Sequence, residues 1–218
     1  MIEVFEGIDE PDYPEIFDDM FRMRHELYVK RRKWNLVSEN GRERDQFDVD
    51  DTTYLLALDE DRSVLGGIRL MPTMGPHLFR DIFPHLAGEH GVPRSPDILE
   101  LTRFFVRPRL RAFNRTQLTG ALVCGMFEHC LEAGISKISS VIDTFFLAQM
   151  LELGWTVKPL SLPMDYGQGS ALGVLIDVSE TALASSRLGR HVEGSVLKHN
   201  RTPTPFPNTP QNIPVHVQ

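Results

Sequence analysis

Ionisable side chains interrupt two apolar segments in the first half of the chain, where a folded core normally holds none. Arg69 lies inside VLGGIRLMPT, and Glu100 and Arg103 lie inside ILELTRFFV. A charge in the core of a strand is costly unless it is paired or used. Potential partners occur nearby in the sequence, at Arg24, Asp45 and Asp48. The pattern therefore predicts either a network of buried ion pairs or a site for a ligand that carries both charges.

The composition is that of a globular protein, with 41% hydrophobic and 24% charged residues among 218. This length is enough for one α/β domain with a full core. The formal net charge of −7 argues against nucleic acid as a partner. No apolar run is long enough to cross a bilayer, and the first residues have no signal-peptide layout. We therefore expect a cytoplasmic protein with no membrane partner.

The cysteines and histidines give no sign of a metal site. Cys124 and Cys130 fall on different faces of one expected helix, so we expect packing residues rather than a disulfide. Neither residue type shows the spacing of metal ligands. Three histidines in a loop-rich stretch are expected at the surface, namely His77, His85 and His90.

The elements that must position the ionisable residues alternate between strands and helices. A first helix is expected over about 14–32 with Asp12 as its N-cap, followed by a long polar loop over 35–51. The remaining pattern predicts strands over 2–7, 53–59, 63–72, 97–106, 136–143 and 170–178, a short helix or turn over 77–86, and helices over 114–134, 144–154 and 180–188. This order is typical of a three-layer α/β/α fold around a central mixed sheet. We expect one catalytic domain over 1–200 and a Pro-rich, extended or disordered tail over 201–218.

The ionisable and aromatic residues together resemble the acyl-homoserine-lactone synthases, the bacterial autoinducer synthases of quorum sensing. The resemblance spans about residues 1–178. It is carried by Arg24, Tyr28, Trp34, Asp45, Asp48, Arg69, Phe83, Glu100 and Arg103. The family more often has phenylalanine at the position of Tyr28, whose hydroxyl adds a potential hydrogen bond.

The resemblance implies a fold similar to GNAT-type N-acyltransferases and two consumed substrates, S-adenosylmethionine and an acyl thioester, without a further cofactor. The amine of S-adenosylmethionine would be acylated, and ring closure would release methylthioadenosine. Glu100 and Arg103 are then the expected catalytic residues, with Glu100 as general base. A backbone N–H at a strand bulge could hold the oxyanion. The expected S-adenosylmethionine contacts are Arg24, Tyr28, Trp34, Asp45, Asp48, Arg69 and Phe83.

Architectural roles stay open for several of these residues. Asp45, Asp48 and Arg69 could form only an ion-pair network that ties the polar loop to the sheet. Trp34 could be a packing anchor, and Glu100 could be the ion partner of Arg103.

The acyl chain is expected between the strand over 97–106 and the strand over 136–143. Its expected contacts are Phe104, Phe105, Val106, Arg107, Met126, Ile142, Thr144, Phe145 and Met150. The resemblance links the position of Thr144 to 3-oxo-acyl chains, whereas bulky Phe145 and Phe146 could shorten the pocket.

The acyl donor is expected to be coenzyme A. Family members mostly use acyl carrier protein, an acidic partner, but the helix over 144–154 has no basic residue and carries Glu152. Acyl carrier protein therefore remains the alternative donor. A cluster of arginines could meet the phosphates of coenzyme A, namely Arg107, Arg109, Arg111 and Arg115. These features favour an acyl-CoA with a short or branched chain.

Two rival functions are weaker. A GNAT acetyltransferase acting on another amine normally has a glycine-rich pyrophosphate loop, but RPRLRAFNRTQL has no glycine before Gly120. A non-catalytic ligand-binding module would use the charges as scaffold only.

Overall fold

The computed structural model describes residues 1–108, 110–167 and 169–199. At its centre lies a nine-stranded sheet in the order β11-β1-β4-β5-β6-β7-β10-β8, with β9 paired to β10. Its strands are β1 Ile2–Glu6, β4 Thr53–Leu58, β5 Val64–Pro72, β6 Ile98–Val106, β7 Lys137–Asp143, β8 Val157–Pro159, β9 Met164–Asp165, β10 Ser170–Asp177 and β11 Leu197–His199. The pairs β1–β11 and β6–β7 are parallel and the others antiparallel. The sheet is therefore mixed, as expected, and the Pro-rich tail lies outside the described residues.

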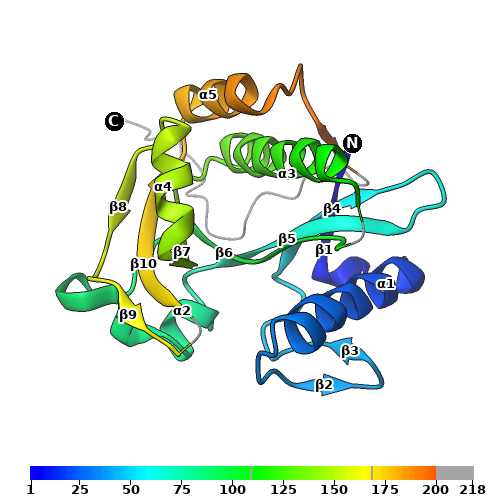
Figure 1. Ribbon diagram of the computed structural model, residues 1–218, viewed down its shortest axis with the longest axis horizontal. Helices are drawn as coiled ribbons and strands as arrows, with labels where there is room; N and C mark the ends of the chain where they lie inside the picture. Colours follow the sequence, from blue (N-terminus) through cyan, green and yellow to red (C-terminus); the bar gives the residue numbers. More distant parts are fainter. Residues whose placement is uncertain (109, 168, 200–218) are drawn as a thin grey trace, which may run out of the picture.

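Helices cover both faces of this sheet (Figure 1). One face carries α3 (Ala112–Glu132), α4 (Thr144–Glu152) and α5 (Glu180–Arg190), whose apolar side chains share one core cluster. The other face carries α1 (Pro14–Arg24), a following π-helix (His25–Arg31) and the small hairpin of β2 (Ser38–Glu39) and β3 (Arg42–Glu43). Two short elements lie near β10, namely α2 (Leu78–Asp81) and the 3₁₀ segment Pro84–His90, and a further 3₁₀ turn is Gly7–Asp9. The expected α/β fold is confirmed.

The alternation of side chains along β6 separates two environments. Leu99 and Leu101 pack into the core beneath α3, and each fully buried leucine contributes roughly 1.5–3 kcal/mol. Glu100 and Thr102 point to the opposite face, because successive strand residues face opposite sides of a sheet. The face beneath α1 and α2 therefore receives the polar residues of the central strand.

A bulge and a fork interrupt the regular pairing of β6. Phe105 pairs with Gly67 and Thr102 with Arg69, so β6 has one residue more than β5 across this step. Arg103 lies inside the step and has a positive φ of 48°. Beside β7, the described pairing runs over residues 98–100 and 137–139, after which the strands separate. The bulge thus lies on the arm of β6 that faces the fork.

Three local expectations are wrong. Tyr13 rather than Asp12 occupies the N-cap of α1, where Pro14 begins the helix and needs no N–H partner. The polar segment 35–51 contains the β2–β3 hairpin. His77 is fully buried, and its Nδ1 lies 3.0 Å from the carbonyl oxygen of Gly75, which supplies a partner that the sequence did not indicate.

Candidate active site

Three arginines and three carboxylates alternate around a closed, buried ring, which we call the charge ring. Its members in order are Arg24, Glu43, Arg103, Asp45, Arg69 and Asp48. Each carboxylate accepts from two arginines, and each arginine donates to two carboxylates. The charges within the ring sum to zero, so its burial leaves no net charge in the core.

Arg24, the last residue of α1, closes the ring beside the first helix. Its Nε donates to Glu43 at 2.6 Å, and its Nη1 and Nη2 donate to the two oxygens of Asp48 at 2.7 and 2.9 Å. The hydroxyl of Tyr54 also donates to Asp48, at 2.8 Å. Arg24 is 0% exposed, so a ligand could reach its guanidinium only by displacing a carboxylate.

Arg69 and Arg103 bring the ring onto the central strands. Arg69 on β5 donates from Nη1 to Asp45 and Asp48 at 2.6 and 2.9 Å, and from Nε to the hydroxyl of Thr102 at 2.9 Å. Arg103 at the β6 bulge donates from Nη2 to Glu43 and Asp45 at 2.8 and 2.7 Å. The ring therefore ties the segment 43–48 to the strand that carries the bulge.

The ring stabilises the charged form of its members. Burial alone would raise the pKa of Asp48, but Arg24 and Arg69 hold this pKa well below its ordinary range. Burial would likewise raise the pKa of Glu43, which Arg24 and Arg103 instead lower. Burial disfavours the charge of Arg24, yet Asp48 and Glu43 raise its pKa above the ordinary value. All three groups stay ionised at neutral pH because each neutralises the others.

Glu43 is a member of the ring that the sequence analysis missed. It lies on β3 in a polar segment, and the structure buries it completely. The available signal was the alternation of GRERD. Glu43 and Asp45 face the ring, while Arg42 pairs with Asp18 and Arg44 with Glu10 at the surface. A two-residue period of opposite charges indicates a strand with one buried polar face.

The ion-pair network considered for Asp45, Asp48 and Arg69 is therefore present. It extends to Arg24 and Arg103, which we expected to contact the substrate. By contrast, the alternative that Glu100 pairs with Arg103 is wrong, because Arg103 donates to Glu43 and Asp45. Glu100 is thereby left available for another role.

Glu100 is a buried carboxyl group at the fork of β6 and β7. It is 0% exposed, its Oε1 accepts the N–H of Phe79 at 2.8 Å, and no described side chain or backbone group bonds its Oε2. Burial raises the pKa of Glu100 to about 8, and the hydrogen bond from Phe79 offsets only part of this rise. A carboxyl group with this pKa can exchange a proton with an amine near neutral pH.

A close approach to β10 holds α2 in place over Glu100. The ring of Phe79 lies directly above Gly173, where any Cβ atom would overlap it. Phe79 is fully buried there with Leu86 and Leu160, and Phe83 packs against the same cluster. Phe83, an expected S-adenosylmethionine contact, thus lies in a different cluster from Tyr28 and Trp34.

Tyr28 and Trp34 form a stacked pair beside the bulge. Their ring centroids lie 5.1 Å apart at an interplanar angle of 13°. The guanidinium of Arg103 lies 5.6 Å from the Tyr28 ring, and that of Arg32 lies 5.2 Å from the Trp34 ring. Tyr28 is buried and Trp34 is half-buried, so Trp34 is the member of the pair that a ligand can reach.

Most of the expected acyl contacts come together on the α3 and α4 side of the fork. One core cluster contains Phe104, Val106, Met126, Ile142 and Met150. These side chains come from both arms of the fork and from the helices above it. Their apolar surface suits an acyl chain that enters between β6 and β7.

Other expected acyl contacts lie elsewhere. Phe145 on α4 is 69% exposed and lies outside this apolar cluster. Phe105 packs on the opposite face of the sheet, in the cluster beneath α1. Arg107, which we expected to contact coenzyme A, instead donates to Asp19 at 2.8 Å. Thr144 is the half-buried first residue of α4.

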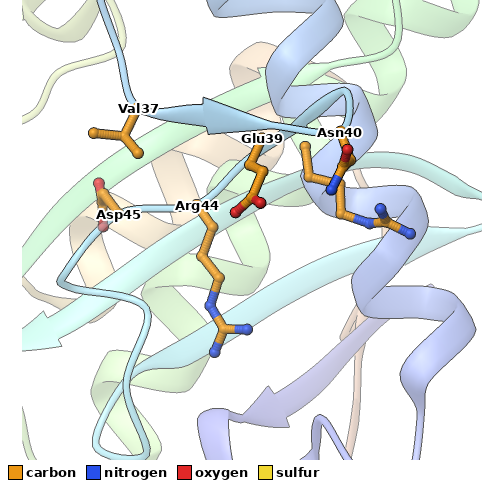
Figure 2. Close-up of a pocket in the computed structure, with 6 residues that line it drawn as sticks. Val37, Glu39, Asn40, Arg44 and Asp45 are labelled. Carbon is orange, nitrogen blue, oxygen red and sulfur yellow. The ribbon is translucent and has the colours of Figure 1, made fainter.

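A hollow of about 380 Å³ adjoins the charge ring on its outer side. Figure 2 shows its lining side chains, which come from the β2–β3 hairpin and from the residues just before and just after it. They are Val37, Glu39, Asn40, Arg42, Arg44 and Asp45. Asp45 is thus shared between the ring and the hollow. Of the six ring members, it alone lines this hollow.

Two kinds of feature are absent from the described ranges. No group of three or more histidine, cysteine, aspartate or glutamate side chains is arranged to hold a metal ion among them. None of the helices described there is long and apolar enough to cross a membrane.

The mixed sheet that forks beside a bulged central strand, with a buried carboxyl group at the fork, suits an enzyme that transfers an acyl group to an amine. The family model for autoinducer synthases matches residues 12–185. An isovaleryl-homoserine lactone synthase from Bradyrhizobium diazoefficiens is 35% identical over 184 residues, which are 84% of this chain and 82% of that protein. The chain belongs to the autoinducer synthase family and is an acyltransferase.

Solved structures agree with this assignment. BjaI, described as a CoA-dependent acyl-homoserine lactone synthase with SAM and isopentyl-CoA, has a TM-score of 0.85 at 32% identity, covering 94% of this chain and 95% of its own. MesI, described as CoA-dependent, has a TM-score of 0.83 at 35% identity, covering 90% and 98%. An N-acetyltransferase from Lactobacillus plantarum, described as putative, shares the fold alone, at 11% identity and a TM-score of 0.53.

Proposed function

We propose that this protein makes an N-acyl-homoserine lactone from S-adenosylmethionine and an acyl-CoA. The observation that carries the proposal is Glu100, a buried carboxyl group with a raised pKa, placed where β6 separates from β7. The family and the relatives described above support the same activity.

The first step would join the α-amine of S-adenosylmethionine to the acyl group. An α-ammonium group has an unperturbed pKa of about 7.7–8.0, close to the value of about 8 for Glu100. Proton transfer from the amine to Glu100, directly or through one water, is therefore nearly balanced in free energy. The free amine then attacks the thioester carbon, the C–S bond breaks, and the coenzyme leaves as a thiol that takes up a proton.

The bulge on β6 supports this step. A bulge leaves backbone groups outside the regular ladder, and here it lies on the arm of the fork that faces the acyl cluster. An N–H at this position would stabilise the negative charge that develops on the thioester oxygen.

The second step would close the lactone ring. The substrate carboxylate attacks its own γ-carbon, the C–S⁺ bond breaks, and methylthioadenosine leaves. The sulfonium is already a good leaving group, so the protein mainly has to hold a folded pose. Trp34 offers a half-buried aromatic face for the adenine or the sulfonium, while Arg103 and Asp45 are the least enclosed charges of the ring.

Coenzyme A is the donor that the surface favours. α4 carries no lysine or arginine and includes Glu152, which does not suit an acidic carrier protein. Arg111 and Arg115 lie exposed at the first turn of the long helix α3, where phosphates are bound well. Arg109 lies outside the described residues. The acyl chain would be short or branched and would contact Phe104, Ile142 and Met150. The reaction would take place in the cytoplasm.

The test is mass spectrometry of the products formed by purified protein with S-adenosylmethionine and a mixture of acyl-CoA and acyl-carrier-protein donors. We expect an acyl-homoserine lactone and methylthioadenosine in equal amounts, with the acyl group drawn from coenzyme A. Acylation of some other amine, without methylthioadenosine, would instead establish an ordinary N-acetyltransferase.

A further inference from the structure

Tyr28 carries a hydroxyl group that touches the backbone of the central strand at its irregular point. The hydroxyl donates to the carbonyl oxygen of Phe104 at 2.8 Å, across 76 residues of sequence. Phe104 directly follows Arg103, the residue of positive φ inside the bulge. A side chain of the first helical segment therefore holds the peptide group next to the bulge.

The register of the sheet shows which way that peptide group faces. Arg107 donates its N–H to Leu65 at 2.7 Å, and Phe105 lies opposite Gly67. Hydrogen-bonded pairs alternate along an antiparallel ladder, so Phe105 is the next residue bonded to β5. The N–H and C=O of Phe104 then point to the other edge of β6, toward the fork with β7.

The ring of Tyr28 is held independently of its hydroxyl. It stacks on Trp34 at 5.1 Å, and the guanidinium of Arg103 lies 5.6 Å from its centroid. It belongs to a π-helix, in which Arg32 donates to the carbonyl of Leu27, five residues back. This rare geometry often occurs at functional sites. Loss of the hydroxyl alone would thus leave the ring in place.

We propose that Tyr28 is a positioning residue for acyl transfer. Its hydroxyl fixes the backbone of Phe104 at the fork, so that the N–H of Phe104, on the same edge of β6, points at the thioester carbonyl. The inference rests on the proposed function and adds to it a residue outside the reacting groups. Burial raises the pKa of Tyr28 to about 12, so the hydroxyl stays a donor throughout the working range of pH.

The experiment compares Tyr28→Phe with wild type in the full chain. Loss of an oxyanion donor itself lowers kcat by about 10²–10³-fold. Loss of a group that only orients the donor should cost less, about tenfold, with the KM for S-adenosylmethionine within twofold of wild type. The fall in kcat should be the same from pH 6 to pH 9. Tyr13→Phe is the matched control, since Tyr13 packs edge-on against Phe5 near the start of α1.

A second measurement separates positioning from a structural role. The alkyl thioether of coenzyme A lacks the carbonyl group, so its dissociation constant should be unchanged in Tyr28→Phe. An unchanged kcat, or a weaker thioether affinity that accompanies the fall in kcat, would overturn the inference. The proposed function would survive either result, because it fails only if wild-type protein releases no methylthioadenosine.

Discussion

Both carboxylate oxygens of Glu43 accept hydrogen bonds from Arg103, at 2.8 and 3.2 Å. One of the same oxygens also accepts from Arg24, at 2.6 Å. A single carboxylate on a two-residue strand thus links the first helix to the bulged central strand. Because the charge ring is closed, removing this carboxylate leaves two arginines facing each other without the charge between them.

Glu43→Gln should destabilise the fold strongly. The substitution keeps the shape but leaves one uncompensated positive charge in the buried ring, and breaking a buried pair costs about 3–5 kcal/mol. Urea unfolding at pH 7 measures this loss. Glu39→Gln on the exposed strand of the same hairpin is the control, with an expected change within about 0.5 kcal/mol. Equal stability of the two variants would show that the ring contributes little to folding.

Glu100→Gln should make stability less dependent on pH. The pKa of Glu100 rises from about 4.3 in the unfolded chain to about 8 in the fold. The folded state therefore holds a proton that the unfolded state loses, and the stabilisation present below about pH 4 is lost as pH rises toward 8. The complete loss, over the whole interval between the two pKa values, amounts to about 5 kcal/mol.

The check is the free energy of unfolding of both proteins at pH 5 and pH 8. The neutral amide has no proton to lose, so the variant should gain relative to wild type as pH rises. Parallel pH profiles would show that the pKa of Glu100 is not raised in the fold, and would remove the match with the pKa of the substrate amine on which its proposed role as base rests.

Trp34→Ala should weaken the binding of S-adenosylmethionine more than it slows the chemical step. A lost aromatic contact with a cationic sulfonium is worth about 1–2 kcal/mol, which corresponds to a rise in KM of about tenfold. Trp34→Phe keeps an aromatic face on Tyr28 and should recover most of the affinity. Steady-state kinetics with varied S-adenosylmethionine provides the measurement, and a change confined to the unfolding midpoint would make Trp34 a packing anchor only.

Two truncations test the boundary of the domain. Deletion of residues 201–218 should leave lactone synthesis unchanged. Deletion from Val196 onward should destabilise the fold, because buried Glu128 accepts the backbone N–H groups of Val196 and Leu197 at 3.0 and 3.2 Å and would lose these two of its donors. Thermal unfolding and product formation measure both effects. Loss of activity on deletion of residues 201–218 would show that the catalytic domain extends beyond residue 200.

The sequence predicted the parts of the fold that depend on local periodicity and on charge in unusual places. The strands around Arg69 and Glu100 and the long helix ending before Gly134 follow from such patterns. The sequence did not predict that the charge ring closes through Glu43. The partner of a charged side chain depends on tertiary structure, and this glutamate lies in a polar segment that is expected to be exposed. The burial of His77 and the exposure of Phe145 were missed for the same reason. Each depends on what packs above the residue, not on the residue itself.

The two faces of β6 differ, since the polar groups of Glu100 and Thr102 point to the face beneath α1 and α2, whereas Leu99 and Leu101 pack beneath α3. If the apolar cluster beneath α3 and α4 holds the acyl chain as proposed, exchanging bulk at Ile142 or Met150 alters the preferred acyl chain without touching the carboxyl group of Glu100 on the other face. Related proteins with this fold could thus diverge in the acyl group of their product through substitutions on one side of the central sheet, while the side that carries Glu100 stays the same.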